Sequence, residues 1–325
     1  MTAEAHPSKL VLVTGANGFV GRRLCELLAR RGHAVRAAIR ANATAPLGAA
    51  EVCRIGELGP AADWTAAVTG VDAVIHLAAK AHVLDRPHDD GEYQRINGGG
   101  TQHLARAAAA AGVRRFVYLS SIKVYGDHAN ATAFRLEDNP QPTDVYGRSK
   151  LAGETFLQEV AATSALEAVI VRPPLVYGPG VRANFLRMLR WVDRELPLPL
   201  GAVQNSRSLV ALDNLCDFLA HSLAHPQART WLVSDGEDVS TPELIRRLAQ
   251  AMQRRVRLVP MPPFMLRAAG ALLGRGADVT RVLGSLTLDT RASHEAMGWR
   301  PPLAMSQALG ETVKWYLDVR DNVDV

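Results

Sequence analysis

The sequence has few cysteines, few aromatic residues and no long apolar run. Its only cysteines are Cys25, Cys53 and Cys216, and their odd number and wide spacing exclude a disulfide framework or a cysteine-based metal knuckle. Such sparse use of cysteine predicts a reducing, cytoplasmic location. The most apolar segment, 264–273, is interrupted by Arg267 and falls well short of the ~20 residues that a membrane-spanning helix needs. We expect no integral membrane segment, and we interpret 264–273 as a buried or interface helix, with a peripheral membrane contact as the alternative.

Neither positive nor negative charge is present in large excess. Lys plus Arg outnumber Asp plus Glu by 37 to 32, and the basic residues form scattered doublets, not a stripe with interleaved aromatics. This pattern argues against nucleic-acid binding and suits a small anionic ligand. The polar segment 1–8 lacks the basic and apolar regions of a secretory signal. With 325 residues, 48% of them hydrophobic, the chain can bury a large core.

Short apolar runs alternate with helical stretches through the first half of the chain. Strands are predicted at 9–14, 34–39, 52–55, 73–77, 116–120 and 168–172. Helices are predicted after Gly18, at 101–111, and at 144–160 with Thr143 as its cap. Strands that are apolar on both faces and alternate with helices predict an α/β fold with a Rossmann-type, doubly wound parallel sheet.

The sequence pattern changes after Arg172, where prolines become frequent. We predict a dinucleotide-binding domain over 1–175, joined by returning segments at about 205–234, in which 209–211 and 231–234 are strands of the main sheet. A smaller, C-terminal substrate-binding portion is expected from 176–204 and 235–320.

The loop between the first strand and the first helix is rich in glycine, with the sequence Gly15-Ala16-Asn17-Gly18-Phe19-Val20-Gly21. The first glycine permits a tight turn, the second lets backbone amides approach a phosphate, and the third lets the helix pack on the strand. The loop therefore predicts a pyrophosphate site at the helix N-terminus. The alternative is that these glycines serve packing alone.

The second predicted strand ends in Ile39 and Arg40. An NAD-specific site usually has a carboxylate here for the ribose hydroxyls, and Ile39 cannot accept a hydrogen bond. Arg40 can hold a 2′-phosphate through a charge-assisted contact, so the strand end favours NADP, with NAD as the alternative. The competing interpretation is an ordinary surface arginine.

Tyr146 and Lys150 lie one helical turn apart on the same predicted helix face. An ammonium group so placed can stabilise a tyrosinate and lower a phenol pKa that is normally about 10. Such a tyrosine exchanges a proton with a carbonyl or hydroxyl oxygen. Ser121 follows the strand 116–120 and can hold that same oxygen. We predict these three residues as the catalytic group.

A second group of chemically reactive side chains lies between the fourth strand and the following helix, and consists of His82, Asp85, His88, Asp89 and Asp90. Their spacing matches no standard zinc or calcium site, and Pro87 indicates a loop. We predict a solvated loop and no metal. His76, at the end of an apolar strand, is interpreted as structural or cofactor-lining.

Taken together, these motifs resemble the extended short-chain dehydrogenase/reductases, the NAD-dependent epimerase/dehydratase group, over nearly the whole chain. The residues that carry the resemblance are Thr14–Gly21, His76–Ala79, Asn97, Thr101, Ser120–Gly126, Tyr146, Lys150 and Arg172–Gly180. The resemblance implies that Ser121, Tyr146 and Lys150 are catalytic and that Lys150 also holds the nicotinamide ribose. It further implies cofactor contacts from Leu77, Ala78, Ala79 and Pro173, with Glu57 and Leu58 beside the adenine.

The later motifs are similar to those of the branch that acts on nucleotide-diphosphate sugars. Asn184 and Phe185 resemble the segment that approaches the sugar nucleotide, and Arg207 resembles the arginine that grips its pyrophosphate. Lys123 and Tyr177 are further predicted substrate contacts. The alternatives are that Asn184 caps a helix and that Arg207 is a surface partner of Asp213.

The function implied by this resemblance is the NADPH-dependent reduction of the 4-keto group of a UDP-linked 4-keto-6-deoxy amino hexose, for surface polysaccharide. The segments at 121–124, 172–177 and 233–238 look closest to bacterial 4-ketoreductases of the UDP-N-acetylquinovosamine type. A UDP-sugar 4-epimerase with tightly bound NAD is the alternative, although Leu175 stands where those enzymes tend to carry asparagine. Further alternatives are a non-catalytic NADP sensor and a reductase of ketones that carry no nucleotide. By the same resemblance we expect a homodimer, formed through 101–111 and 144–160.

Overall fold

The computed structural model describes residues 9–80, 90–127, 132–274 and 276–321. A seven-stranded parallel sheet organises the larger lobe, in the order β3-β2-β1-β4-β5-β6-β9. Its strands are β1 (Leu10–Thr14), β2 (Ala34–Arg40), β3 (Glu51–Ile55), β4 (Ala73–His76), β5 (Arg115–Leu119), β6 (Glu167–Arg172) and β9 (Thr230–Leu232). The strand order reverses between β1 and β4, which places a ligand crevice at their carboxyl ends. The predicted Rossmann-type sheet is confirmed, with strand ends shifted by one or two residues.

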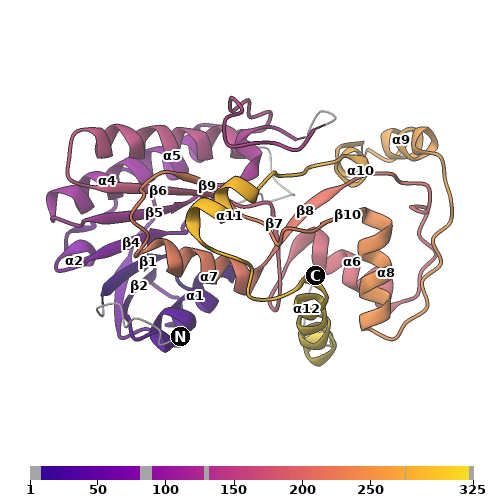
Figure 1. Ribbon diagram of the computed structural model, residues 1–325, viewed down its shortest axis with the longest axis horizontal. Coiled ribbons are helices and arrows are strands. Elements are labelled where there is room, and N and C mark those ends of the chain that lie inside the picture. Colours follow the sequence, from indigo (N-terminus) through magenta and orange to yellow (C-terminus); the bar gives the residue numbers. More distant parts are fainter. Residues whose placement is uncertain (1–8, 81–89, 128–131, 275, 322–325) are drawn as a thin grey trace.

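Helices cover both faces of this sheet (Figure 1). One face packs against α1 (Phe19–Arg30) and α7 (Leu212–Ser222), and the other against α2 (Thr65–Val68), α4 (Gly100–Ala110) and α5 (Val145–Ala162). The short elements α3 (Asp90–Tyr93) and η1 (Gln94–Gly99) lead into α4, and η2 (Ile122–Val124) follows β5. Because both faces are covered, β1 and β4 are almost entirely apolar and buried.

A smaller lobe is built on a second sheet of three strands, β10-β8-β7. Its strands are β7 (Leu175–Tyr177), β8 (Arg207–Ala211) and β10 (Asp238–Val239). The remaining helices are α6 (Ala183–Asp193), α8 (Thr241–Ala251), α9 (Pro263–Leu272), α10 (Gly276–Leu283), α11 (Arg291–Met297) and α12 (Met305–Val319). A separate apolar cluster joins α6, α8 and α12 to this sheet, so the smaller lobe has its own core.

Three sequence expectations are corrected by these elements. The strand at 209–211 belongs to the small sheet, where β8 pairs with β7 and β10, whereas 231–234 does contribute β9 to the main sheet. The N-cap of α5 is Asp144, not Thr143, because the Asp144 carboxylate accepts a hydrogen bond from the Gly147 amide at 2.6 Å. The helix at 264–273 is also far from buried, since Leu272 is 88% exposed.

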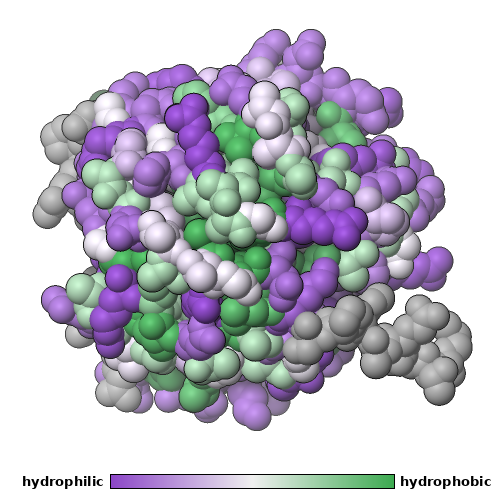
Figure 2. Space-filling model, turned by 90° about the vertical axis from the view of Figure 1, so that its left-hand side faces the viewer, coloured by the Kyte–Doolittle hydropathy of each residue, from purple (hydrophilic) through white to green (hydrophobic). Residues whose placement is uncertain are grey.

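The surface is predominantly polar at the end of the molecule that carries the main sheet. Figure 2 shows this end, with hydrophilic side chains over most of the face and apolar ones toward its centre. Within the described ranges, no helix has both the length and the apolar character needed to cross a bilayer.

Candidate active site

The glycine loop brings the start of α1 against the carboxyl end of β4. Gly15 has φ +66°, and a Cβ added there would lie 2.9 Å from the Ala78 amide nitrogen. Gly21 packs even closer, because its Cβ would lie 2.2 Å from the Gly15 carbonyl oxygen. Side chains at these positions would push the helix away from the sheet. Both glycines are therefore required for the close approach that the sequence predicts.

A buried hydrogen-bond chain fixes the two strand ends that frame this loop. The Thr14 hydroxyl accepts a hydrogen bond from the Ala78 amide at 3.2 Å and lies 2.6 Å from His76 Nδ1. His76 Nε2 lies 3.2 Å from the Thr101 hydroxyl. Burial, with a smaller effect from the Lys150 charge, lowers the pKa of His76 to about 3. His76 is therefore neutral and links β1, β4 and α4, as its structural interpretation predicts.

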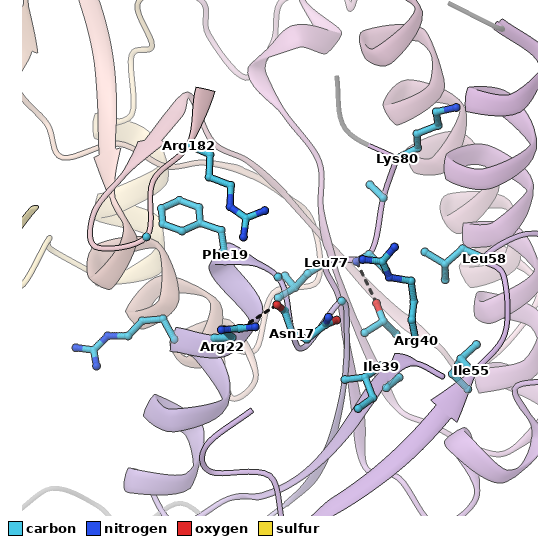
Figure 3. A pocket seen from close by; sticks show the side chains of 18 of the residues that line it. Asn17, Phe19, Arg22, Ile39, Arg40, Ile55, Leu58, Leu77, Lys80 and Arg182 are labelled. Carbon is cyan, nitrogen blue, oxygen red and sulfur yellow. Dashed lines mark hydrogen bonds between the residues drawn. The ribbon is translucent and has the colours of Figure 1, made fainter. Parts of the chain in front are cut away.

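A cavity of about 1060 Å³ opens at the carboxyl ends of the central strands. Figure 3 shows side chains from the glycine loop, the end of β2 and the segment after β4 turned toward this cavity. Its lining includes ten of the residues predicted to bind the dinucleotide, namely Gly15, Asn17, Gly18, Phe19, Arg40, Glu57, Leu58, Leu77, Ala78 and Ala79. Five others are not in the lining: Val20, Gly21, Tyr146, Lys150 and Pro173.

The cavity carries arginines suited to an anion. Arg40 at the end of β2 and Arg182 before α6 both line it, and neither side chain forms an ion pair or hydrogen bond within the described ranges. Arg22, in the first turns of α1, donates from Nε to the Asn17 carbonyl at 3.0 Å. Two lining acids, Glu57 and Asp213, are already paired with arginines. The sequence analysis does not predict Arg22 or Arg182 at this site. Each follows a glycine turn, and such turns often form anion-binding sites, so the sequence did contain an indication of them.

The predicted catalytic residues come from α5 and from the segment between β5 and η2. Ser121 is the N-cap of η2, and its hydroxyl accepts a hydrogen bond from the Lys123 amide at 3.2 Å. Gly147 lets α5 approach this segment, since a Cβ there would lie 2.5 Å from the Lys123 carbonyl oxygen. Tyr146, next to Gly147, therefore lies at the contact between α5 and η2, and Lys150 follows one turn later.

The pKa of Tyr146 differs from the one that the sequence predicts. Burial, the Asp144 carboxylate and Tyr93 raise the pKa of Tyr146 to about 12, whereas the sequence predicts a lowered value. Lys150 is itself buried, which lowers its pKa to about 7. The two effects have one cause, because burial favours the neutral form of both groups. At neutral pH Tyr146 is therefore a protonated phenol that can donate its proton.

The side chain of Lys150, on α5, is surrounded by aromatic and polar side chains. Its ammonium nitrogen lies 4.1 Å from the centre of the Tyr118 ring, which in turn stacks on His76 at 5.6 Å. Asn97 donates to the Ser149 hydroxyl at 2.9 Å and, through its carbonyl oxygen, accepts the Lys80 amide at 2.7 Å. These contacts join α5 to the strand ends of β4 and β5, so the position of Lys150 is set by the core.

A buried ion pair that the sequence does not reveal lies one turn beyond Lys150. Arg172, from β6, donates from Nε to Glu154 at 3.0 Å and from Nη1 to the Tyr125 hydroxyl at 2.6 Å. The Ser120 hydroxyl also donates to the Glu154 carboxylate. The spacing of Glu154 four residues after Lys150 was the available signal, since both then share one helix face.

Two of the predicted substrate residues are core residues instead. Tyr177 is fully buried, donates its hydroxyl to Asp235 at 2.8 Å and stacks on Phe185 at 5.6 Å. Phe185 is 1% exposed and packs in the apolar cluster of the smaller lobe. Their side chains therefore support the lobe and offer no surface to a ligand. The apolar neighbours of Phe185 in α6 give it a packing role that the motif alone does not reveal.

The other three predicted substrate residues are polar side chains at the surface or its edge. Lys123 forms ion pairs with Asp127 and Asp144, the second at 3.2 Å, and burial lowers its pKa. Asn184 is exposed and accepts a hydrogen bond from the Arg187 side chain; the N-cap of α6 is Arg182, so Asn184 does not cap the helix.

Arg207 begins β8 and donates from Nη1 to the Arg281 carbonyl oxygen at 2.5 Å. Asp213, its alternative partner, instead pairs with Arg23. Neither Lys123, Asn184 nor Arg207 lines the large cavity.

Most of the alternative metal group falls outside the described residues, namely His82, Asp85, His88 and Asp89. Its last member, Asp90, pairs with Arg148 at 2.9 Å. Elsewhere in the described ranges, no cluster of three or more histidine, cysteine or acidic side chains is placed to hold a metal ion.

The sheet, the glycine cradle and the arginine-lined cavity together define a dinucleotide-binding protein of the Rossmann class. The fit to a dinucleotide is good, because the α1 N-terminus and Gly18 face the cavity where a pyrophosphate would lie. A profile of the NAD dependent epimerase/dehydratase family matches residues 11–233, more than half of the chain. The chain belongs to this family.

Two curated proteins and one solved structure show how this chain relates to others. It is 36% identical to a UDP-glucose 4-epimerase of Vibrio cholerae, over 98% of this chain and 99% of that protein. It is 29% identical to a GDP-6-deoxy-D-mannose reductase of Pseudomonas aeruginosa, over 96% of this chain and 98% of that one. The structure of MoeE5 in complex with UDP-glucose and NAD is 27% identical and superposes with a TM-score of 0.78, covering 95% and 99% of the two chains.

Proposed function

We propose that this protein is an NAD(P)-dependent enzyme that acts at C4 of a UDP-linked hexose, and that it interconverts the two C4 epimers. The observation that carries the proposal is the end-to-end similarity to a UDP-glucose 4-epimerase, together with Tyr146 and Lys150 one turn apart on α5. This ranks the epimerase above the 4-ketoreductase that the sequence motifs favour.

Each part of the proposed site has a separate role. Gly15, Gly18 and the α1 N-terminus hold the dinucleotide pyrophosphate, and Arg40 contacts the adenosine ribose or its 2′-phosphate. The chemistry that a bound nicotinamide supplies is hydride transfer at C4. Tyr146 exchanges the proton of O4, and Ser121 orients that oxygen. Lys150 provides a nearby positive charge while it is protonated, which its pKa of about 7 allows up to neutral pH.

The test is incubation of the purified protein with UDP-glucose and with UDP-N-acetylglucosamine, without added reductant, followed by NMR of the sugar. We expect a mixture of C4 epimers and no net consumption of cofactor. Tyr146→Phe should lower the rate by about 10²–10⁴-fold while melting temperature and dinucleotide binding are retained. Normal turnover by Tyr146→Phe would refute the assigned chemistry, and absence of the second epimer would refute the epimerase.

A 4-ketoreductase that uses NADPH is the second candidate, and two observations favour it. Arg40, at the end of β2, lines the cavity, and its side chain forms no ion pair within the described ranges. The relative from Pseudomonas aeruginosa is named as a reductase. Loss of NADPH absorbance in the presence of a UDP-4-keto-6-deoxy sugar, with stoichiometric alcohol formation, would select this candidate over the first.

A further inference from the structure

Helix α9 exposes a large apolar surface. Phe264 is 68% exposed, Leu272 is 88% exposed and Leu273, just beyond the helix end, is 75% exposed. Figure 1 shows α9 at the outer end of the smaller lobe, remote from the main sheet, and no residue of α9 lines the cavity. Clustered apolar exposure of this kind marks a surface that contacts another apolar phase or molecule.

The exposed apolar residues lie on one side of the helix. At about 100° per residue, Phe264, Ala268 and Leu272 follow one another along the same face, with Met265 beside them. Leu266 and Gly270 occupy the opposite face, and they are the only buried residues of α9. The helix is therefore anchored to the lobe by one face, where it packs on α10, and presents the other outward.

The surroundings of this face are basic. From 254 to 283 the sequence contains six arginines and one acidic residue, Asp278. Arg257, in the segment that leads into α9, and Arg267, on the helix, are both exposed, and neither pairs with an acidic side chain in the described part of the chain. An exposed apolar helix that carries one unpaired arginine and is preceded in the chain by another is complementary to a membrane surface with anionic lipids.

We propose that α9 is a peripheral membrane-docking element that inserts its apolar face among the lipids of an anionic bilayer. The helix has ten residues, or about 15 Å at ~1.5 Å per residue, roughly half the hydrocarbon thickness. It therefore lies in the plane of the interface and does not span it. Phe264, Met265 and Leu272 enter the acyl region, while Arg257 and Arg267 meet the phosphates.

A second copy of the chain fits this face less well. A twofold contact places the same patch of both subunits together, so the arginines around α9 would face their own copies. Like charges brought together at an interface oppose association. A lipid surface of negative charge has the opposite effect, because each arginine gains a phosphate partner.

The experiment is flotation of the full-length protein with two kinds of vesicle, one of phosphatidylglycerol with phosphatidylethanolamine and one of phosphatidylcholine alone. We expect binding to the first kind, weakened by salt, and little binding to the second. The double variant Leu272→Ser/Leu273→Ser should lower the partition coefficient by roughly tenfold or more. Arg267→Glu should lower binding to the anionic vesicles only.

The matched control is Leu47→Ser, because Leu47 is 76% exposed but lies between β2 and β3, away from α9. It should bind like the unmodified protein, and all variants should keep their melting temperature. Absence of binding by the unmodified protein, or equal loss in the Leu47 control, would overturn the proposal. Sedimentation velocity tests the alternative occupant, a second copy of the chain. If the unmodified protein is a dimer that does not bind vesicles, and the variant Leu272→Ser/Leu273→Ser is a monomer, the face belongs to a second copy.

Discussion

Arg172 and Glu154 form a two-point ion pair inside the protein, with Nε–Oε1 3.0 Å and Nη2–Oε2 2.5 Å. Glu154 is 2% exposed and Arg172 is 6% exposed. Hydrogen bonds to Tyr125 and from Ser120 satisfy the remaining polar atoms. The pair joins β6 to α5 one helical turn from Lys150, and so it ties this helix to the sheet.

Glu154→Gln should therefore destabilise the protein strongly. It leaves the Arg172 guanidinium buried without a counter-charge, and we expect a loss of about 3–5 kcal/mol in the free energy of unfolding, measured by urea denaturation. Replacing both partners, as Glu154→Gln/Arg172→Met, should recover part of this loss. Glu243→Gln, which breaks an exposed ion pair with Arg247, is the control and should cost less than ~1 kcal/mol. A similar small cost for Glu154→Gln would contradict the role assigned to the pair.

Stability should rise with pH through the titration of Lys150. Burial lowers its pKa from 10.5 to about 7, so between these values the unfolded chain holds the proton and the folded chain does not. Folding is then favoured by up to about 1.4 kcal/mol for each pH unit above 7, until the unfolded lysine also loses its proton. Lys150→Met removes this contribution. The difference in unfolding free energy between the two proteins, measured from pH 7 to 9, should change in favour of the unmodified protein; a constant difference would show that Lys150 titrates normally.

Gly21→Ala should disrupt the glycine loop. Its new methyl group would lie 2.2 Å from the Gly15 carbonyl and 2.7 Å from Ala16 Cα, both backbone atoms that cannot move aside cheaply. We expect loss of dinucleotide binding by calorimetry and destabilisation of at least ~1–3 kcal/mol. Gly310→Ala, in α12, is the control, since a Cβ there meets no atom within 4 Å. That variant should be as stable as the unmodified protein or more so. Equal behaviour of the two variants would refute the packing argument.

Arg40 should discriminate between the two nicotinamide dinucleotides. Arg40→Ser removes a charged donor for the 2′-phosphate, so we expect the dissociation constant for NADP to increase by roughly 10–100-fold. The dissociation constant for NAD serves as the internal control and should change little. Titration calorimetry with both dinucleotides measures the ratio directly. Equal weakening of both, or of neither, would remove Arg40 from the specificity argument.

Local patterns in the sequence were sufficient for the main sheet. Apolar runs such as 73–77 are short, buried on both faces and separated by helical periodicity, so their burial requires a layered parallel sheet whatever the side-chain details. The glycine loop and the Tyr146–Lys150 spacing are likewise local, and the structure places them at strand ends and on one helix face. The division into domains stays a prediction, and so do the substrate roles of Lys123, Asn184 and Arg207.

Tertiary structure alone decided the rest. The partner strands of 209–211, the burial of Tyr177 and Phe185, and the pairing of Arg172 with Glu154 all join residues distant in sequence. The acidity of Tyr146 belongs to the same group, because burial and the Asp144 and Tyr93 side chains raise its pKa only once the helix is packed. The sequence by itself determined which segments become strands and helices, since that depends on periodicity and backbone freedom along the chain. Which side chains lose contact with water depends on what packs over them, and this sets their charge and their exposure.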